Sequence, residues 1–254
     1  MSLLSDFMIS IRSYSEAISL IRAHKMGRIF FFSCFLYLFL IIISSSIMWY
    51  GLDYFIESLL SLSYIKSLSQ WLSKYPWLLT ITKIALYLSS IFYFISIFKY
   101  LFLAIASPLY AYLSEKTSEA VNNTSYPLNV AQLIKDIGRG VIISLKNMAK
   151  QFFLTMLLFI LSFIPIVGLV SSFLIIILDC YYYGFSMLDY NCERNKMDVK
   201  QSSQLISSQK GLAIGNGLVM YLSLFIPFIG VMFIAPLSAV AASIAFYKKN
   251  PQTV

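Results

Sequence analysis

The sequence predicts an all-α integral membrane protein that crosses a bilayer more than once. Of its 254 residues, 59% are hydrophobic and only 12% are charged, whereas soluble domains carry about 25% charged residues. Long runs without a charge recur along the chain, the first over residues 29–50. Two of these runs contain nearly identical hexapeptides, FIPIVG and FIPFIG. We treat residues 1–254 as a single membrane domain built of helices and helical hairpins.

The first 28 residues predict an amphipathic N-terminal helix. Apolar residues recur at helical spacing and polar residues lie between them. The apolar face is expected to carry Leu4, Phe7, Ile11, Tyr14, Ile18 and Ile21. Such a helix can lie in the plane of the lipid headgroups.

Two long spans are expected next. Residues 29–50 contain no charge and end in Trp49 and Tyr50, residue types that anchor helices at the interface. As a helix they would measure about 33 Å, enough for the ~30 Å hydrocarbon layer. Residues 77–113 form the second span, in which Lys83 and Lys99 are placed to reach opposite interfaces.

The second half of the chain favours two helical hairpins, over residues 152–178 and 212–247. Each is interrupted by a Pro-x-x-Gly motif, and the expected turn residues are Pro165 and Gly168 in the first and Pro227 and Gly230 in the second. The arms of the second hairpin would be about 22–27 Å long, short for a full crossing. We therefore expect hairpins that enter partway, with single kinked spans as the alternative. An amphipathic cytoplasmic helix over 127–151 leads into the first hairpin.

The distribution of basic residues predicts the orientation. Residues 1–28 hold four Lys and Arg against two acids, and residues 114–151 hold five against three. Residues 51–76 are balanced, and the C-terminal tail is basic. The positive-inside rule therefore places the N-terminus, residues 114–151 and the C-terminus in the cytoplasm. It also accounts for the net charge of +8 without nucleic acid as a partner.

Enzymatic and metal-dependent functions are disfavoured. The chain has one histidine, His24, and three cysteines in no paired spacing, Cys34, Cys180 and Cys192. It lacks the GxxxxGK[ST], HExxH and GxSxG motifs. We expect no catalytic residues, no metal and no cofactor.

The best candidate for a binding site is a basic cluster where the first helix meets the first span. Arg22, Lys25 and Arg28 are the expected anion-binding residues, with His24 among them. Cationic donors gathered at a helix end can hold an anion by charge-assisted hydrogen bonds. The alternative is the ordinary basic flank of a membrane span, which binds lipid phosphates.

Landmarks along the whole chain resemble the CysZ-type sulfate permeases and the wider etoposide-induced-protein family. They include Phe163-Ile164-Pro165 through Gly168, Met187-Leu188-Asp189-Tyr190, Ile226-Pro227 and Pro236, and Ala106-Ser107-Pro108. The resemblance implies two long membrane helices, two pairs of shorter, partly penetrating helices, and a homo-oligomer. It also implies an anion site at the motif Gly-Leu-x-x-Leu-x-x-Pro-x-Leu-Arg-Arg, whose matching positions here are Ala17, Ile18, Ile21, His24, Met26, Gly27 and Arg28.

Two functions remain open at this point. The first is a permease or channel of the cell inner membrane that carries sulfate or a similar small oxyanion for assimilation. Its partners would be the anion, membrane lipids and further copies of the chain. The second is a non-transporting membrane protein of the same fold that acts in envelope or lipid homeostasis or in assembly. The basic cluster favours the first, whereas His24 and Gly27, which replace the proline and first arginine of the motif, favour the second.

Overall fold

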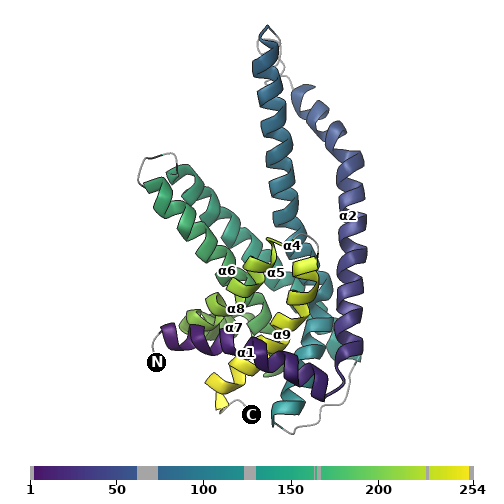
Figure 1. Ribbon diagram of the computed structural model, residues 1–254, viewed down its shortest axis with the longest axis vertical. Coiled ribbons are helices and arrows are strands. Elements are labelled where there is room, and N and C mark those ends of the chain that lie inside the picture. The colour runs from purple at the N-terminus through teal and green to yellow at the C-terminus, as the bar shows by residue number, and fades with distance from the viewer. Residues whose placement is uncertain are drawn as a thin grey trace. The chain divides into compact units, whose positions relative to one another are not determined.

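The computed structural model describes residues 3–61, 74–122, 130–162, 164, 167–226 and 229–251. Within them the chain is helical and contains no strand, which confirms the all-α prediction. The helices, labelled in Figure 1, are α1 (Leu3–Ala23), α2 (Gly27–Ser61), α4 (Pro76–Asn122), α5 (Val130–Leu161), α6 (Val167–Arg194), α7 (Val199–Ser208), α8 (Lys210–Ser223) and α9 (Ile229–Lys249).

Four helical segments within these ranges are long and apolar enough to cross a membrane. They are Gly27–Leu52, Gly138–Leu161, Val167–Arg194 and Gly230–Lys249. The chain is therefore a multi-pass membrane protein. It divides into a larger unit, made of Met1–Leu38 and Leu103–Val254, and a smaller unit, Phe39–Phe102.

Helices α6, α8 and α9 form the centre of the larger unit, together with α1. Glycines allow α6 and α8 to touch backbone to backbone: a Cβ on Gly217 would lie 1.7 Å from the Cys180 carbonyl oxygen, and one on Gly184 would lie 1.9 Å from that of Ala213. Helix α1 meets α8 in the same way at Gly211 and Gly215. Gly211 and Gly215 thus form a Gly-x-x-x-Gly motif that serves close helix packing.

Polar side chains of α1 complete this contact. Ser10 donates a hydrogen bond to the Leu212 carbonyl (3.0 Å), and Tyr14 donates one to the Asn216 carbonyl (2.8 Å). Burial raises the pKa of the Tyr14 phenol well above its ordinary value, so the phenol remains a neutral donor. The buried face of α1 therefore consists mainly of small and polar residues, while Leu4 and Ile18 from its apolar stripe stay exposed.

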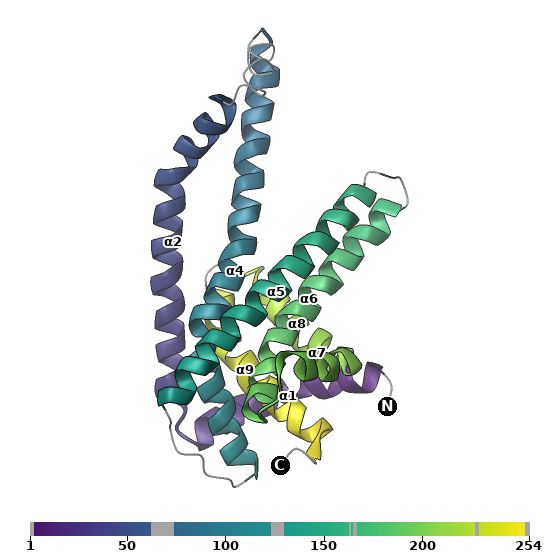
Figure 2. The ribbon, with the colours of Figure 1, turned by 180° about the vertical axis from the view of Figure 1, so that it is seen from behind.

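The C-terminal end of α9 lies against α1. Lys249 forms an ion pair with Asp6 (Nζ–Oδ1 2.5 Å), and Lys248 pairs with Glu16. Both termini consequently lie at the same end of the larger unit, as Figures 1 and 2 show.

Helix pairs α5–α6 and α8–α9 are each separated by a short break that contains one of the repeated hexapeptides. Gly168 and Gly230 lie in the first turn of the helix after the break, and a Cβ on either would collide with a carbonyl oxygen before it, of Ser162 (2.3 Å) or Ser223 (2.0 Å). Pro165 and Pro227 lie outside the described residues. Figure 2 shows α5 and α6 side by side along much of their length.

Several helices are longer than the sequence segments on which they were predicted. Helix α2 continues beyond Tyr50 to Ser61, because no proline interrupts it, and α4 continues through Pro108 to Asn122. Helix α5 joins the amphipathic segment and the first arm of the hairpin into one helix. In the smaller unit Trp49, Tyr50 and Trp77 are exposed, while the side chains of Lys83 and Lys99 lie outside the described residues.

Candidate functional site

The predicted basic cluster lies on the turn that joins α1 to α2. Helix α1 ends at Ala23, and the Met26 N–H donates to the Ile21 carbonyl (3.2 Å). Lys25 has a φ of 53°, so this is the arrangement of a Schellman motif, with Lys25 at the position that glycine usually takes. Met26 is only 3% exposed. A buried apolar anchor and a backbone hydrogen bond thus hold the turn.

This turn directs its cationic side chains outward. Arg22, His24, Lys25 and Arg28 are all exposed. No ion pair is recorded for Arg22, Lys25 or Arg28 among the residues that the structure describes. The His24 ring lies against the Leu20 carbonyl (Nδ1···O 3.3 Å). The structure therefore brings the three predicted anion-binding residues together at one turn. None of the ion pairs recorded among the described residues neutralises their charges.

An apolar hollow of about 160 Å³ adjoins the cluster. Ile18, Ile21 and Arg22 line it from α1, Phe30 from α2, and Phe233 and Leu237 from α9. Phe30 and Phe233 stack with their ring centroids 6.2 Å apart. Arg22 therefore stands at the border between an apolar hollow and solvent.

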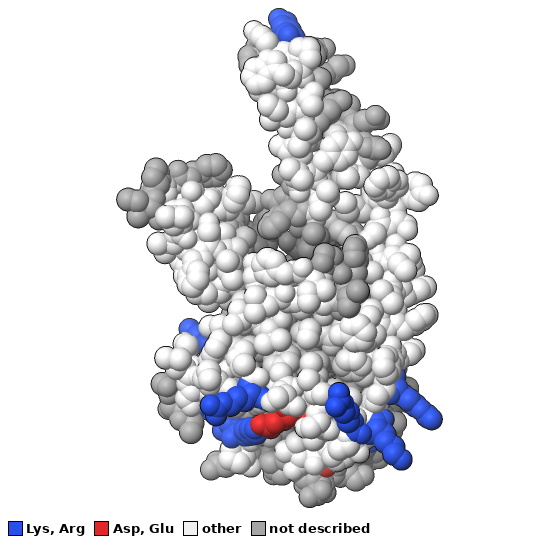
Figure 3. Space-filling model, viewed as in Figure 1, with Lys and Arg blue, Asp and Glu red and all other residues white. Residues whose placement is uncertain are grey.

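Figure 3 places this cluster in a wider pattern on the larger unit. The visible Lys and Arg side chains gather over α1 and the C-terminal part of α9, and the surface of the α5–α6 arm is uncharged. Cations gathered beside a surface without visible charge are typical of a protein at the membrane–water interface. The basic turn is part of this charged side of the larger unit.

A buried polar network is a second arrangement in the larger unit, and it was not predicted from the sequence. Arg139 of α5 forms ion pairs with two residues of α6, Asp189 (3.1 Å) and Glu193 (3.7 Å), and Ser202 of α7 donates to Asp189. A neighbouring chain of hydrogen bonds links Ser243 to Ser114 (3.0 Å) and Ser114 to Asn191 (2.7 Å). The network ties α4, α5, α6, α7 and α9 together.

Only part of this network left a signal in the sequence. Asp189 and Glu193 are four residues apart and so share one face of α6, which could have indicated a buried acidic pair. Arg139 lies 50 residues before Asp189, and no local pattern predicts that contact. Buried ion pairs add little net stability compared with apolar packing, but losing one partner is costly. We interpret the network as a structural connection between helices.

Groups suited to metal binding are absent from the described ranges: no three His, Cys, Asp or Glu side chains there come together. The three cysteines are buried and form no disulfide with one another. What the arrangement offers chemically is cationic hydrogen-bond donors.

Comparison with known proteins bears on these features. The family model described as sulfate transporter CysZ/etoposide-induced protein 2.4 matches residues 13–235. A sulfate transporter CysZ of Pseudomonas fluorescens is 26% identical over 148 residues, 58% of this chain and 59% of the relative. One of Pseudomonas syringae pv. tomato is 23% identical over 190 residues, 74% of this chain and 73% of the relative. The match with the P. fluorescens protein thus spans about three fifths of that protein's length.

The matched region runs from the middle of α1 into α9. It includes the basic turn, both helix breaks and every member of the buried network except Ser243. The family description names a transport protein and no enzyme. The chain belongs to the sulfate transporter CysZ/etoposide-induced protein 2.4 family.

Proposed function

We propose that the protein is a permease of the inner membrane for sulfate or a similar small oxyanion, and that Arg22, Lys25 and Arg28 bind the anion. The observation that carries this proposal is the α1–α2 turn itself, which exposes three cations with no recorded acidic partner in the described part of the chain. Membership of a family described by sulfate transport supports it.

The exposure of these side chains suits transient binding of a transported anion better than tight binding of a resident one. An ion pathway needs a site that attracts the ion but also releases it. Arginine donates to tetrahedral oxyanions through a planar fork, whereas lysine acts as a mobile point charge. Solvent screens the exposed charges, so an oxyanion should be held weakly and leave quickly.

Partial penetration of the hairpins is the second part of the proposal. Gln151 of α5 donates a hydrogen bond to Asp179 of α6, which marks a polar level between these helices. Beyond it, α5 continues only from Phe152 to Leu161, about 15 Å of helix against a ~30 Å hydrocarbon layer. We therefore infer that α2 and α4 cross the bilayer, and that α5–α6 and α8–α9 enter it partway.

An assembly follows from partial penetration. The backbone at the helix breaks must be covered by protein or face water, because lipid offers it no hydrogen bonds. A homo-oligomer would supply that cover and could enclose a path between copies, with lipids around it. The ion pairs of Lys248 and Lys249 with α1 support a proposal that both termini lie on one side of the membrane, and the excess of basic residues supports the cytoplasm as that side.

A non-transporting protein of the same fold is the second candidate. The observation that favours it is Gly27, which stands where the family motif has its first arginine, together with His24 in place of the proline. With one arginine fewer, the turn could act only as an anchor to lipid phosphates.

Sulfate uptake separates the two candidates. Purified full-length protein in liposomes should show saturable uptake of radioactive sulfate above that of empty liposomes, and Arg28→Ala should abolish most of it. Arg12→Ala is the matched control, because Arg12 is also an exposed arginine of this region but lies on α1, ten residues before Arg22. Absence of uptake from folded, inserted wild-type protein would refute the permease, and equal losses in both variants would refute the site.

A further inference from the structure

A second hollow in the larger unit lies between α5, α6 and α7. It has a volume of about 250 Å³ and is lined by Ile143, Lys146, Asn147 and Lys150 of α5, Phe185 of α6, and Val199, Lys200 and Ser203 of α7. A buried water needs only about 10–15 Å³ of such space. The hollow therefore has room for a small polyatomic group together with solvent.

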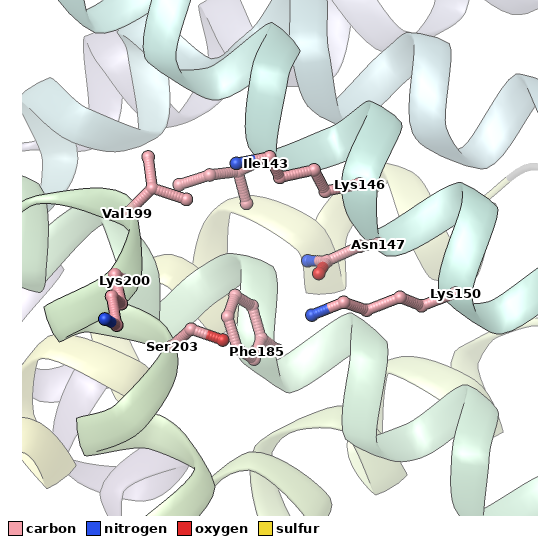
Figure 4. Close-up of a pocket in the computed structure, with 8 residues that line it drawn as sticks. All are labelled: Ile143, Lys146, Asn147, Lys150, Phe185, Val199, Lys200 and Ser203. Carbon is pink, nitrogen blue, oxygen red and sulfur yellow. The ribbon is translucent and has the colours of Figure 1, made fainter.

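Asn147 provides the main evidence that this hollow binds a ligand. Its side chain is only 4% exposed, and its Nδ2 has no hydrogen-bond partner. A buried donor without a partner is unfavourable, and native proteins rarely leave one unpaired. Figure 4 shows its amide pointing into the same space as the Lys150 ammonium. A ligand that accepts hydrogen bonds would remove this cost.

The charge of the lining indicates what kind of acceptor fits. Lys146, Lys150 and Lys200 contribute three positive charges, and none of them has a recorded ion pair among the described residues. Asp198 is close in sequence, but its carboxylate accepts the Lys200 and Gln201 N–H groups as the cap of α7. Ser203 adds a hydroxyl from the α7 side (Figure 4). Cationic and neutral donors without a carboxylate in the lining are suited to an oxyanion.

Position distinguishes this hollow from the basic turn. Lys146 and Lys150 are one helical turn apart on α5, and Leu154 and Leu157 continue the same face toward the apolar end of the helix. These leucines are 42% and 55% exposed. A phosphate held by the lysines would thus sit at the start of an exposed apolar stripe, which matches a phospholipid headgroup followed by its acyl chain.

We propose that this hollow is a phosphate-type oxyanion site that takes the headgroup phosphate of an anionic phospholipid. Asn147 Nδ2 and Ser203 Oγ donate to the phosphate oxygens, and the three lysines balance its charge. A free phosphate ion offers the same oxygens without the acyl chain, so the test includes both sources. The site goes beyond anion transport and does not depend on it.

The test measures binding rather than flux. Full-length protein in an uncharged detergent is titrated with phosphatidylglycerol, and native mass spectrometry measures the fraction with one lipid bound. A parallel series adds inorganic phosphate as a competitor. The variants are Lys146→Gln with Lys150→Gln, and Asn147→Asp, which places a carboxylate in the hollow. Lys210→Gln, at an exposed lysine outside the hollow, is the matched control.

We expect the lysine double variant and Asn147→Asp each to weaken phosphatidylglycerol binding by about tenfold or more, the loss of a hydrogen bond to a charged group, and Lys210→Gln to bind as wild type does. Phosphate that displaces the lipid at equal concentration would support the oxyanion site with the free ion as its source. The lysine substitutions are at exposed positions and should leave folding intact. Lipid binding equal to wild type in the folded double variant would overturn the proposal, as would an equal loss in Lys210→Gln.

Discussion

The contact between α6 and α8 makes a quantitative prediction for Gly217→Ala. The added Cβ would lie 1.7 Å from the Cys180 carbonyl oxygen, 2.6 Å from its carbon and 2.9 Å from the Gly184 nitrogen. Ordinary contact begins at 3.4 Å, so the oxygen must retreat by 3.4 − 1.7 = 1.7 Å. All three atoms are backbone, and no rotamer change can relieve the collision. The two helices must therefore move apart.

The expected cost is at the upper end of overpacking, about 3 kcal/mol. For a chain of this size, that corresponds to a melting temperature lower by roughly 6–12 °C, measured by the loss of monodisperse protein on heating in detergent. Gly138→Ala is the matched control, because a Cβ at Gly138 in α5 meets nothing within 4 Å and should be neutral or stabilising by up to about 1 kcal/mol. If Gly217→Ala melted within 2 °C of wild type, about the measurement error, the backbone contact between α6 and α8 would be wrong.

Two further predictions concern charge. A Cβ at Gly27 meets nothing within 4 Å, so Gly27→Arg should fold normally and should lower the sulfate concentration needed for half-maximal uptake; unchanged or weaker uptake would contradict an anion site on this turn. Arg139→Met leaves Asp189 and Glu193 buried without their cation and should cost about 3–5 kcal/mol. Arg12→Met, at an exposed position, should leave the melting temperature unchanged, and equal melting of both variants would refute a structural role for the network.

The helical class and the membrane location could be predicted from the sequence because both depend on local composition. A run such as residues 29–50 has no charge to solvate, and in lipid only a structure that satisfies its own backbone can hold it. The breaks after α5 and α8 coincide with Pro-x-x-Gly motifs, in which the proline removes a backbone N–H and the glycine permits a turn. Proline alone does not suffice, since α4 continues through Pro108. Helix ends were less predictable, as α2 shows, since interface residues such as Trp49 do not stop a helix.

The partner of each helix face could not be predicted, and α1 illustrates why. Its apolar stripe predicts a helix in the plane of the lipid headgroups and gives no indication of the face that packs on protein; the structure buries Ser10, Ser13 and Ala17 there and leaves Leu4 and Ile18 exposed. Lipid is as apolar as leucine, so burying leucine against protein gains little in a membrane. Small residues instead let α1 approach Gly211 and Gly215 closely. Which face is buried thus depends on a helix 200 residues away.

The same holds for the candidate sites: one is formed by residues close in sequence, and the other by residues from separate helices. The basic turn could be predicted because Arg22, Lys25 and Arg28 lie within seven residues of one another. The lysine hollow could not be predicted, because its donors come from α5 and α7, which are distant in sequence and come together only in the folded protein. Lys146 and Lys150 read in sequence as ordinary basic residues of a cytoplasmic helix.

The two proposed basic sites also differ in the neighbours of their charges, and this difference supports the different roles that we propose for them. Arg22, Lys25 and Arg28 project from a turn into solvent, where water screens an anion and allows it to leave. The lysines of the hollow surround Asn147, whose buried Nδ2 has no protein partner, so a bound oxyanion would replace a missing hydrogen bond as well as balance charge. A transported ion should therefore favour the turn, and a resident lipid should favour the hollow. We therefore expect Arg28→Ala to lose sulfate uptake and to keep its binding of phosphatidylglycerol.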